Sequence, residues 1–123
     1  MARHHISLEL AREPGRPQGD GQDGYDLVLA LNAENRMDVA AVAEAPEQTR
    51  VRRFIGGETT AVGQLTRDSD GRWRLDFPGE ADDETGFRLE DEPFVLGEYV
   101  SIADPNGVLH PYRVTLARPL EAA

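Results

Sequence analysis

The stretch that most constrains the fold of this chain is residues 94–116, where two alternating runs flank the tetrapeptide Asp-Pro-Asn-Gly at 104–107. Proline presets φ for a type I turn, asparagine suits the next position, and glycine adopts the left-handed conformation that returns the chain. After the turn one parity collects Val108, His110, Tyr112, Val114 and Leu116. The stretch therefore predicts a β-hairpin whose strands each have one buried face.

Similar alternation recurs along the whole chain. It predicts strands at 4–12 and 25–31, a second hairpin at 49–55 and 59–67 around Gly56 and Gly57, and a strand at 72–77. A further short run at 87–89 lies between two acidic segments. In the strand at 72–77, Trp73 alternates with Arg72 and Arg74, so we expect Trp73 to lie in the core.

The period changes between Asn35 and Pro46, where Val39 and Val42 repeat at helical spacing. Asn35 or Asp38 is a suitable cap for a short helix, and Pro46 prevents its continuation. We predict an all-β fold, a small barrel or compact sandwich of about seven or eight antiparallel strands with at most one short helix.

The length of 123 residues is most simply one domain covering 1–123. A glycine- and proline-rich segment predicts a mobile loop at 13–24, and we expect a frayed tail at 118–123. No cysteine is present, which excludes disulfides and thiolate chemistry, and no apolar signal block begins the chain. We therefore expect a cytoplasmic protein.

The formal charge of −10 arises from 23 acidic residues against 13 basic ones, and every basic residue is arginine. A strong negative charge disfavours binding to nucleic acid or to anionic membranes. We expect neither as a partner.

No motif fixes a reaction. Ser7, Ser69 and Ser101 lie outside any nucleophile elbow, and the chain has no glycine-rich phosphate loop. The acidic runs at 82–84 and 90–92 are typical of solvated loops. We assign no catalytic residues and do not expect an enzyme, although small barrels assemble sites from residues far apart in sequence.

The histidines do not form an obvious metal site. His4 and His5 are adjacent in a strand and project to opposite faces, so only His4 and His110 are candidates to share an ion, if the terminal strands pair. The segment 68–71 opens like a calcium loop, but no glutamate closes it, which favours a hairpin turn. We predict no metal and no cofactor.

Arginines concentrate in the central strands. Arg50, Arg52, Arg72 and Arg74 are interleaved with aromatic residues there. We expect the central arginines to pair with the acid-rich segment 76–98, within the molecule or across a subunit interface. These four arginines are the predicted interaction surface.

The segments 4–7, 51–54 and 97–102, with Gly71, Trp73, His110 and the pair at 113–114, resemble a group of small bacterial proteins of unknown function. The resemblance covers most of the chain. It implies a bacterial, proteobacterial source and no activity, because that group has no assigned catalytic residues.

Two hypotheses of function follow. The first is a non-enzymatic cytosolic β-barrel that acts as an interaction or assembly module, as a homo-oligomer or with a protein partner. The second is a small-molecule-binding barrel whose site contains Tyr99, His110, Tyr112 and Arg113, because barrels bind ligands where polar groups converge on an apolar pocket.

Overall fold

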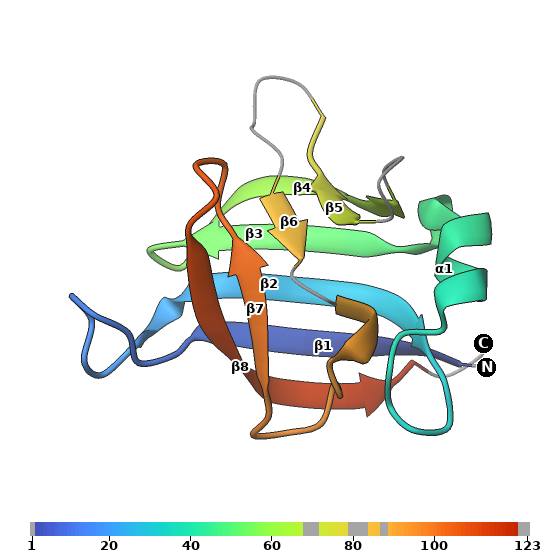
Figure 1. The fold of residues 1–123 in the computed structure, drawn as a ribbon, viewed down its shortest axis with the longest axis horizontal. Helices are drawn as coiled ribbons and strands as arrows, with labels where there is room; N and C mark the ends of the chain where they lie inside the picture. Colours follow the sequence, from blue (N-terminus) through green and yellow to red (C-terminus); the bar gives the residue numbers. More distant parts are fainter. Residues whose placement is uncertain (1, 68–71, 79–83, 87–88, 121–123) are drawn as a thin grey trace.

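The computed structural model describes residues 2–67, 72–78, 84–86 and 89–120, and it confirms the all-β fold. Eight antiparallel strands form a closed barrel in chain order (Figure 1). The strands are β1 (Ala2–Leu10), β2 (Asp20–Leu31), β3 (Arg50–Ile55), β4 (Glu58–Arg67), β5 (Trp73–Asp76), β6 (Glu84–Gly86), β7 (Tyr99–Ala103) and β8 (Leu109–Pro119).

The terminal strands close the barrel. Ile6 of β1 pairs with Leu27 of β2 on one side and with Ala117 of β8 on the other. Closure gives the backbone groups of both strands a partner and removes the exposed edge that an open sheet presents.

The hairpin around residues 104–107 is confirmed. The amide of Gly107 donates to the carbonyl oxygen of Asp104 at 2.9 Å, and the carboxylate of Asp104 accepts from the amides of Asn106 and Val108 at 2.9 and 3.0 Å. These bonds fix the reversal of the chain. The first strand of the hairpin is shorter than the sequence run, because β7 begins at Tyr99.

The predicted buried face is wrong at Val108 and at Leu116. Val108 precedes β8 and is 54% exposed. The register between β1 and β8 shifts, so that Ser7 pairs with Leu116 whereas Leu8 pairs with Val114. The extra residue on β8 reverses the faces beyond it. Ala117, in place of Leu116, packs against the core.

The predicted helix is α1 (Val39–Glu44), and Asp38 is its N-cap. The Asp38 carboxylate accepts from the amide of Ala41 at 3.1 Å, which satisfies one of the free amides of the first turn. α1 is followed by the 3-10 helix η1 (Pro46–Gln48). α1 contacts β2 and β4 at one end of the barrel (Figure 1).

The second predicted hairpin is also confirmed. β3 and β4 are joined by Gly56 and Gly57 at φ 62° and 80°, as a tight hairpin turn with two left-handed residues requires. The turn predicted at 68–71 lies outside the described residues.

Other predicted boundaries also differ from the structure; the strand predicted at 4–12, for example, is Ala2–Leu10. β2 begins at Asp20, inside the segment predicted as a loop at 13–24, because Asp20 pairs with Leu10 of β1. The strand predicted at 87–89 is displaced: β6 occupies Glu84–Gly86, and the 3-10 helix η2 (Leu89–Asp91) follows, with 87–88 outside the described residues. β8 continues to Pro119, within the predicted tail, of which 121–123 are not described.

Side chains fill the barrel. The largest that are fully buried are Trp73, Tyr25, Phe94, Ile6, Leu8, Leu27, Leu29, Met37, Leu65, Leu75, Leu89 and Ile102. The core position predicted for Trp73 is confirmed, since 1% of that residue is exposed. An eight-stranded barrel has an interior just wide enough for side chains to fill, which is the arrangement found here.

Candidate functional site

The structure divides the four predicted ligand-binding residues into two pairs. His110 and Tyr112 line a cavity of about 190 Å³ at the end of the barrel away from α1, which we call the mouth. Tyr99 and Arg113 are cross-strand partners on the outer face and line a groove of about 530 Å³. Successive residues of a strand face opposite sides, so His110 and Tyr112 cannot share one site with Arg113.

His110 lies between two carboxylates at the mouth. Its Nδ1 is 2.9 Å from Oε1 of Glu13, and its Nε2 is 3.0 Å from Oδ2 of Asp104. The bond to Asp104 raises the pKa of His110 above its ordinary value, and Glu13 adds to this against the effect of burial. The same bond lowers the pKa of Asp104. A protonated imidazole donates to both acids and so joins the 11–19 loop to the β7–β8 turn.

This arrangement predicts a pH dependence of stability. Since the pKa of His110 is raised on folding, its contribution is fully present below the unfolded pKa of about 6.5 and is lost as the pH rises through the folded pKa. We expect the free energy of unfolding to fall between pH 6 and pH 9 more steeply in the native protein than in His110→Gln. Urea denaturation at several pH values measures this, and parallel curves for the two proteins would contradict it.

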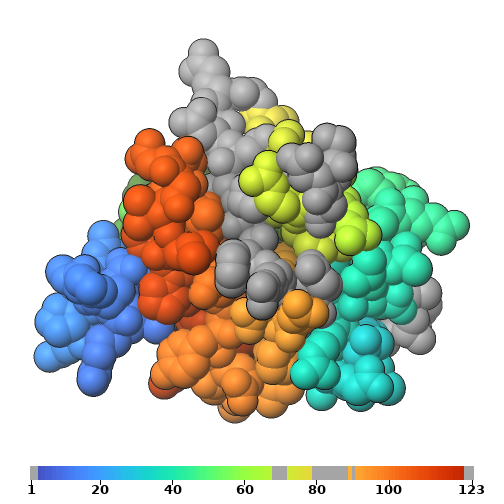
Figure 2. Space-filling view, in the orientation of Figure 1, coloured from blue at the N-terminus to red at the C-terminus, as the bar shows by residue number. Residues whose placement is uncertain are grey.

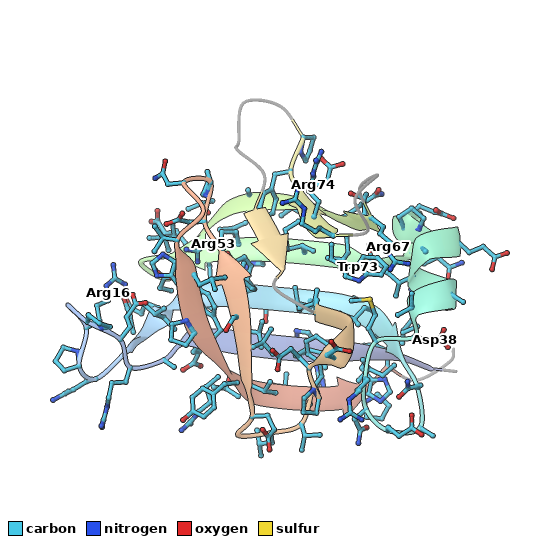
Figure 3. All side chains as sticks on the ribbon, viewed as in Figure 1. Arg16, Asp38, Arg53, Arg67, Trp73 and Arg74 are labelled. Carbon is cyan, nitrogen blue, oxygen red and sulfur yellow. The ribbon has the colours of Figure 1, made fainter. Side chains whose placement is uncertain are left out.

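A second ion pair closes the mouth. Nη1 of Arg53 donates to Oδ1 of Asp23 at 2.6 Å, and the two side chains are only 12% and 10% exposed. The same nitrogen donates to the carbonyl oxygens of Gly24 and Phe54, and the guanidinium lies 4.7 Å from the centre of the Tyr25 ring. Figure 3 shows Arg53 and Arg16 at the same end of the barrel, away from Asp38 and Trp73. These contacts are those of a structural pair that seals the lumen.

The Asp26 carboxylate contacts three side chains on the outer wall. Its carboxylate accepts from Ser7 Oγ at 2.5 Å and from Arg52, and His5 Nε2 lies 3.3 Å away. Burial raises the pKa of Asp26, but the hydrogen bonds from Ser7, Arg52 and His5 outweigh it, so the pKa is below its ordinary value. The carboxylate stands between serine and histidine, so the histidine cannot take the serine proton as a catalytic triad requires.

The expected pairing of the central arginines with residues 76–98 is wrong for two of them. Arg52 pairs with Asp26 and Arg53 with Asp23, both on β2, because β3 lies beside β2 in the barrel. Alternation also places Arg52 outward and Arg53 inward. Adjacent arginines in the sequence therefore have different surroundings.

The four arginines of the predicted interaction surface lie on the outer wall but not in one patch. Arg50 lines an outer groove of about 790 Å³ beside Gln64 and Asp76. In the strand register, Arg52 of β3 lies opposite Val62 of β4, and Arg74 of β5 lies opposite Thr66 of β4. Val62 and Thr66 are four residues apart on β4, so the two arginines are separated along the wall of the barrel. Arg72 and Arg74 are exposed.

The terminal strands pair, but they do not bring the histidines together. His4 is opposite Pro119, and His110 lies at the other end of β8, roughly 30 Å away at about 3.3 Å per residue. Among the residues that the structure describes, no three histidine, aspartate or glutamate side chains are grouped as metal ligands would be.

Sequence reasoning missed most of the mouth. Glu13, Asp23 and Asp104 were not singled out, because each is distant in sequence from its partner. The alternation along β3 does indicate the position of Arg53. Arg53 lies two residues after the buried Val51 and therefore on the same, inward face of the strand. A charged residue on the buried parity of a strand indicates a paired internal group.

The fold and these sites define a small closed β-barrel with a filled interior, a polar mouth and two outer grooves. No protein-family model matches the sequence, and no solved structure matches it. A stretch of 64 residues, 52% of the chain, is 38% identical to malto-oligosyltrehalose trehalohydrolase of Mycobacterium tuberculosis, in strains CDC 1551 / Oshkosh and ATCC 25618 / H37Rv. The chain spans about 10% of the length of these curated relatives, which are bacterial.

Within the described part of the chain, no helix is both long enough and apolar enough to cross a membrane.

Proposed function

We propose that the protein is a non-enzymatic assembly module that binds a second copy of itself through the outer face of the β7–β8 hairpin. Exposed large hydrophobic side chains support this. Seven are found among the described residues, and five of them lie between positions 95 and 109: Val95, Leu96, Tyr99, Val108 and Leu109. Figure 2 shows this segment, in orange to red, at the surface of one side of the molecule. Apolar side chains gathered in one region are typical of interaction surfaces.

The hairpin face, as we call it, consists of the outward residues of the two strands. Its members are Tyr99, Ser101, Ala103, Leu109, Pro111 and Arg113. Tyr99 and Leu109 are two of the five exposed hydrophobic residues, and the other three flank the strands of the hairpin. Only Arg113 is charged, although 29% of the chain is charged and its formal charge is −10. Two copies with this charge repel each other over most of their surface. The hairpin face is the region where they meet with little electrostatic cost, and this favours a second copy as the partner.

The filled interior favours the same function. The cavity that His110 and Tyr112 line at the mouth is about 190 Å³, below the roughly 300 Å³ at which ligand pockets commonly begin. Binding to another protein requires no lumen, because an outer face of sufficient area is enough.

Replacing Leu109 with glutamate tests this function. Leu109 is 47% exposed, so the change is tolerated by the fold but puts a charge in the interface. We expect the dimer dissociation constant to rise at least about tenfold, measured by sedimentation velocity. Ile55→Glu is the matched control, since Ile55 is 50% exposed at the end of β3 and the added charge is the same. Equal weakening by both variants would contradict the assignment of the interface.

A second candidate function is the binding of a small molecule in the groove beside Tyr99 and Arg113. The observation that favours it is the volume of about 530 Å³, which lies within the range of ligand sites. This groove is on the outer wall, so it differs from the site inside the barrel mouth that His110 and Tyr112 line.

A further inference from the structure

We propose that the groove beside Tyr99 binds a neutral saccharide; this inference rests on the second candidate function and names the class of its ligand. The Tyr99 groove, as we call it, lies where the chain after β1 approaches the β7–β8 hairpin. Figure 2 shows that chain in blue beside the hairpin in orange to red. Its polar lining consists of Glu9, Arg12, Gln18, Asp20, Tyr99, Arg113 and Thr115.

The charges of the lining point to a neutral ligand. Two carboxylates, Glu9 and Asp20, stand with two guanidinium groups, Arg12 and Arg113, so the formal charge of the groove is zero. The molecule as a whole has a formal charge of −10, which repels anions at a distance. A hydroxyl-rich ligand suits this lining, because hydroxyl groups donate to carboxylates and accept from guanidinium groups.

Tyr99 supplies an aromatic surface in this polar groove. It is 56% exposed, and its cross-strand partner is Arg113. A tyrosine ring has an apolar body and a polar tip, and it offers a large, rigid contact area with little conformational entropy to lose. Pyranose rings have an apolar face of C–H groups and a rim of hydroxyls. Stacking on Tyr99 would bury that face while the rim contacts the charged side chains.

Four polar side chains of the groove are available for a ligand. Within the described residues, the side chains of Glu9, Arg12, Gln18 and Arg113 make no hydrogen bond or ion pair. Asp20, by contrast, already accepts from the amide of Gln22 and from Arg16, and Thr115 donates to the carbonyl oxygen of Ser7 at 3.4 Å. Free donors and acceptors in one groove bind hydroxyls without first breaking internal bonds, so less energy is lost on binding.

The position of the groove adds rigidity. Glu9, Tyr99 and Arg113 are held by the paired strands β1, β7 and β8, whereas Arg12 and Gln18 come from the connecting segment between β1 and β2. Sites built on strands are positioned more precisely than sites on loops.

The partial similarity to an enzyme that is named for malto-oligosyltrehalose makes a malto-oligosaccharide the first probe.

The test is a titration of ¹⁵N-labelled protein with maltoheptaose, followed by NMR, in the Leu109→Glu background so that self-association does not interfere. We expect saturable shifts confined to the amides around Glu9, Gln18 and Tyr99. Tyr99→Ala should weaken binding at least about tenfold, and Tyr99→Phe should retain it, because the ring is kept. Arg74→Ala, on the outer side of β5, is the control that leaves binding unchanged.

The other outcomes are separable. Absence of shifts with maltoheptaose, trehalose and cellohexaose at millimolar concentration would overturn the inference. If glucose 6-phosphate binds in the Tyr99 groove and the neutral sugars do not, the small-molecule site stands and the neutral-ligand inference fails. Equal losses for Tyr99→Phe and Tyr99→Ala would remove the stacking argument. The dimer constant is measured on separate samples, so the assembly function is judged independently.

Discussion

Replacing Trp73 with alanine is expected to lower the free energy of unfolding by about 3–5 kcal/mol, the range for removing a large buried aromatic side chain. Trp73 is 1% exposed and opens β5, which has only four residues. The guanidinium of Arg67 lies 5.3 Å from the centre of the indole ring, and Trp73→Ala removes this cation–π contact as well. The cavity left in a filled barrel cannot close without moving the strands on both sides.

Leu96→Ala is the matched control for this change. Leu96 is 67% exposed, and its truncation is expected to change stability by no more than about 0.5 kcal/mol. Urea denaturation followed by circular dichroism measures both variants. A loss below about 1 kcal/mol for Trp73→Ala would mean that the barrel is not packed around this residue.

Arg53→Met is expected to lower the free energy of unfolding by about 3 kcal/mol, the lower end of the range for breaking a buried ion pair, because it removes the close partner of Asp23 and leaves this carboxylate with Arg16, a largely exposed side chain at 3.3 Å. Asp23 is 7% exposed, and its ion pair to Arg53 has the short distance of 2.6 Å. The double variant Arg53→Met, Asp23→Leu removes both charges. It should be more stable than Arg53→Met alone, since no buried carboxylate remains without its close partner.

Arg52→Met is the control for the buried pair. Arg52 is the neighbouring residue, and its pair with Asp26 is more exposed, at 31% and 25%. We expect it to cost no more than about 1 kcal/mol. Denaturation curves of the native protein, Arg53→Met, Asp23→Leu and the double variant form a double-mutant cycle, and Arg52→Met is the control outside it. A double variant less stable than Arg53→Met would contradict a dominant role of the buried charge.

The fold was largely predictable because its determinants are local. The turns at 56–57 and 104–107, the cap at Asp38 and the alternation around Trp73 each depend on a few neighbouring residues. The register of β8 did not follow from such rules. Leu116 faces away from the core because of an extra residue opposite Ser7 and Leu8, and this bulge arises from pairing with a distant strand.

The sites were less predictable, because they join residues far apart in the sequence. His110 and Glu13 are separated by 97 positions, and Arg53 and Asp23 by 30. The sequence indicated Tyr99, His110, Tyr112 and Arg113 as one group, but strict alternation on β8 divides them between the mouth and the outer wall. Tertiary pairing, which no local pattern encodes, decides which charged residues meet.

The two proposed surfaces meet at Tyr99 and Arg113. Both residues belong to the hairpin face and both line the Tyr99 groove. Leu109 lies on the hairpin face alone, and Arg12 and Gln18 lie in the groove alone. Variants at these separate positions distinguish self-association from ligand binding. If Tyr99 and Arg113 contact both the second copy and the ligand, a saturating ligand should weaken the dimer. The reason is that two binding events at shared residues lower each other's affinity by the same factor.

The most direct test of the account is the solution mass of the unmodified protein, measured by sedimentation equilibrium over a wide range of concentrations. The chain mass is 13.6 kDa. Association through the hairpin face predicts a mass that rises with concentration to twice this value and stops there, because an isologous contact between two copies closes on itself. A mass that stays at that of one chain at the highest concentration would contradict the proposed assembly.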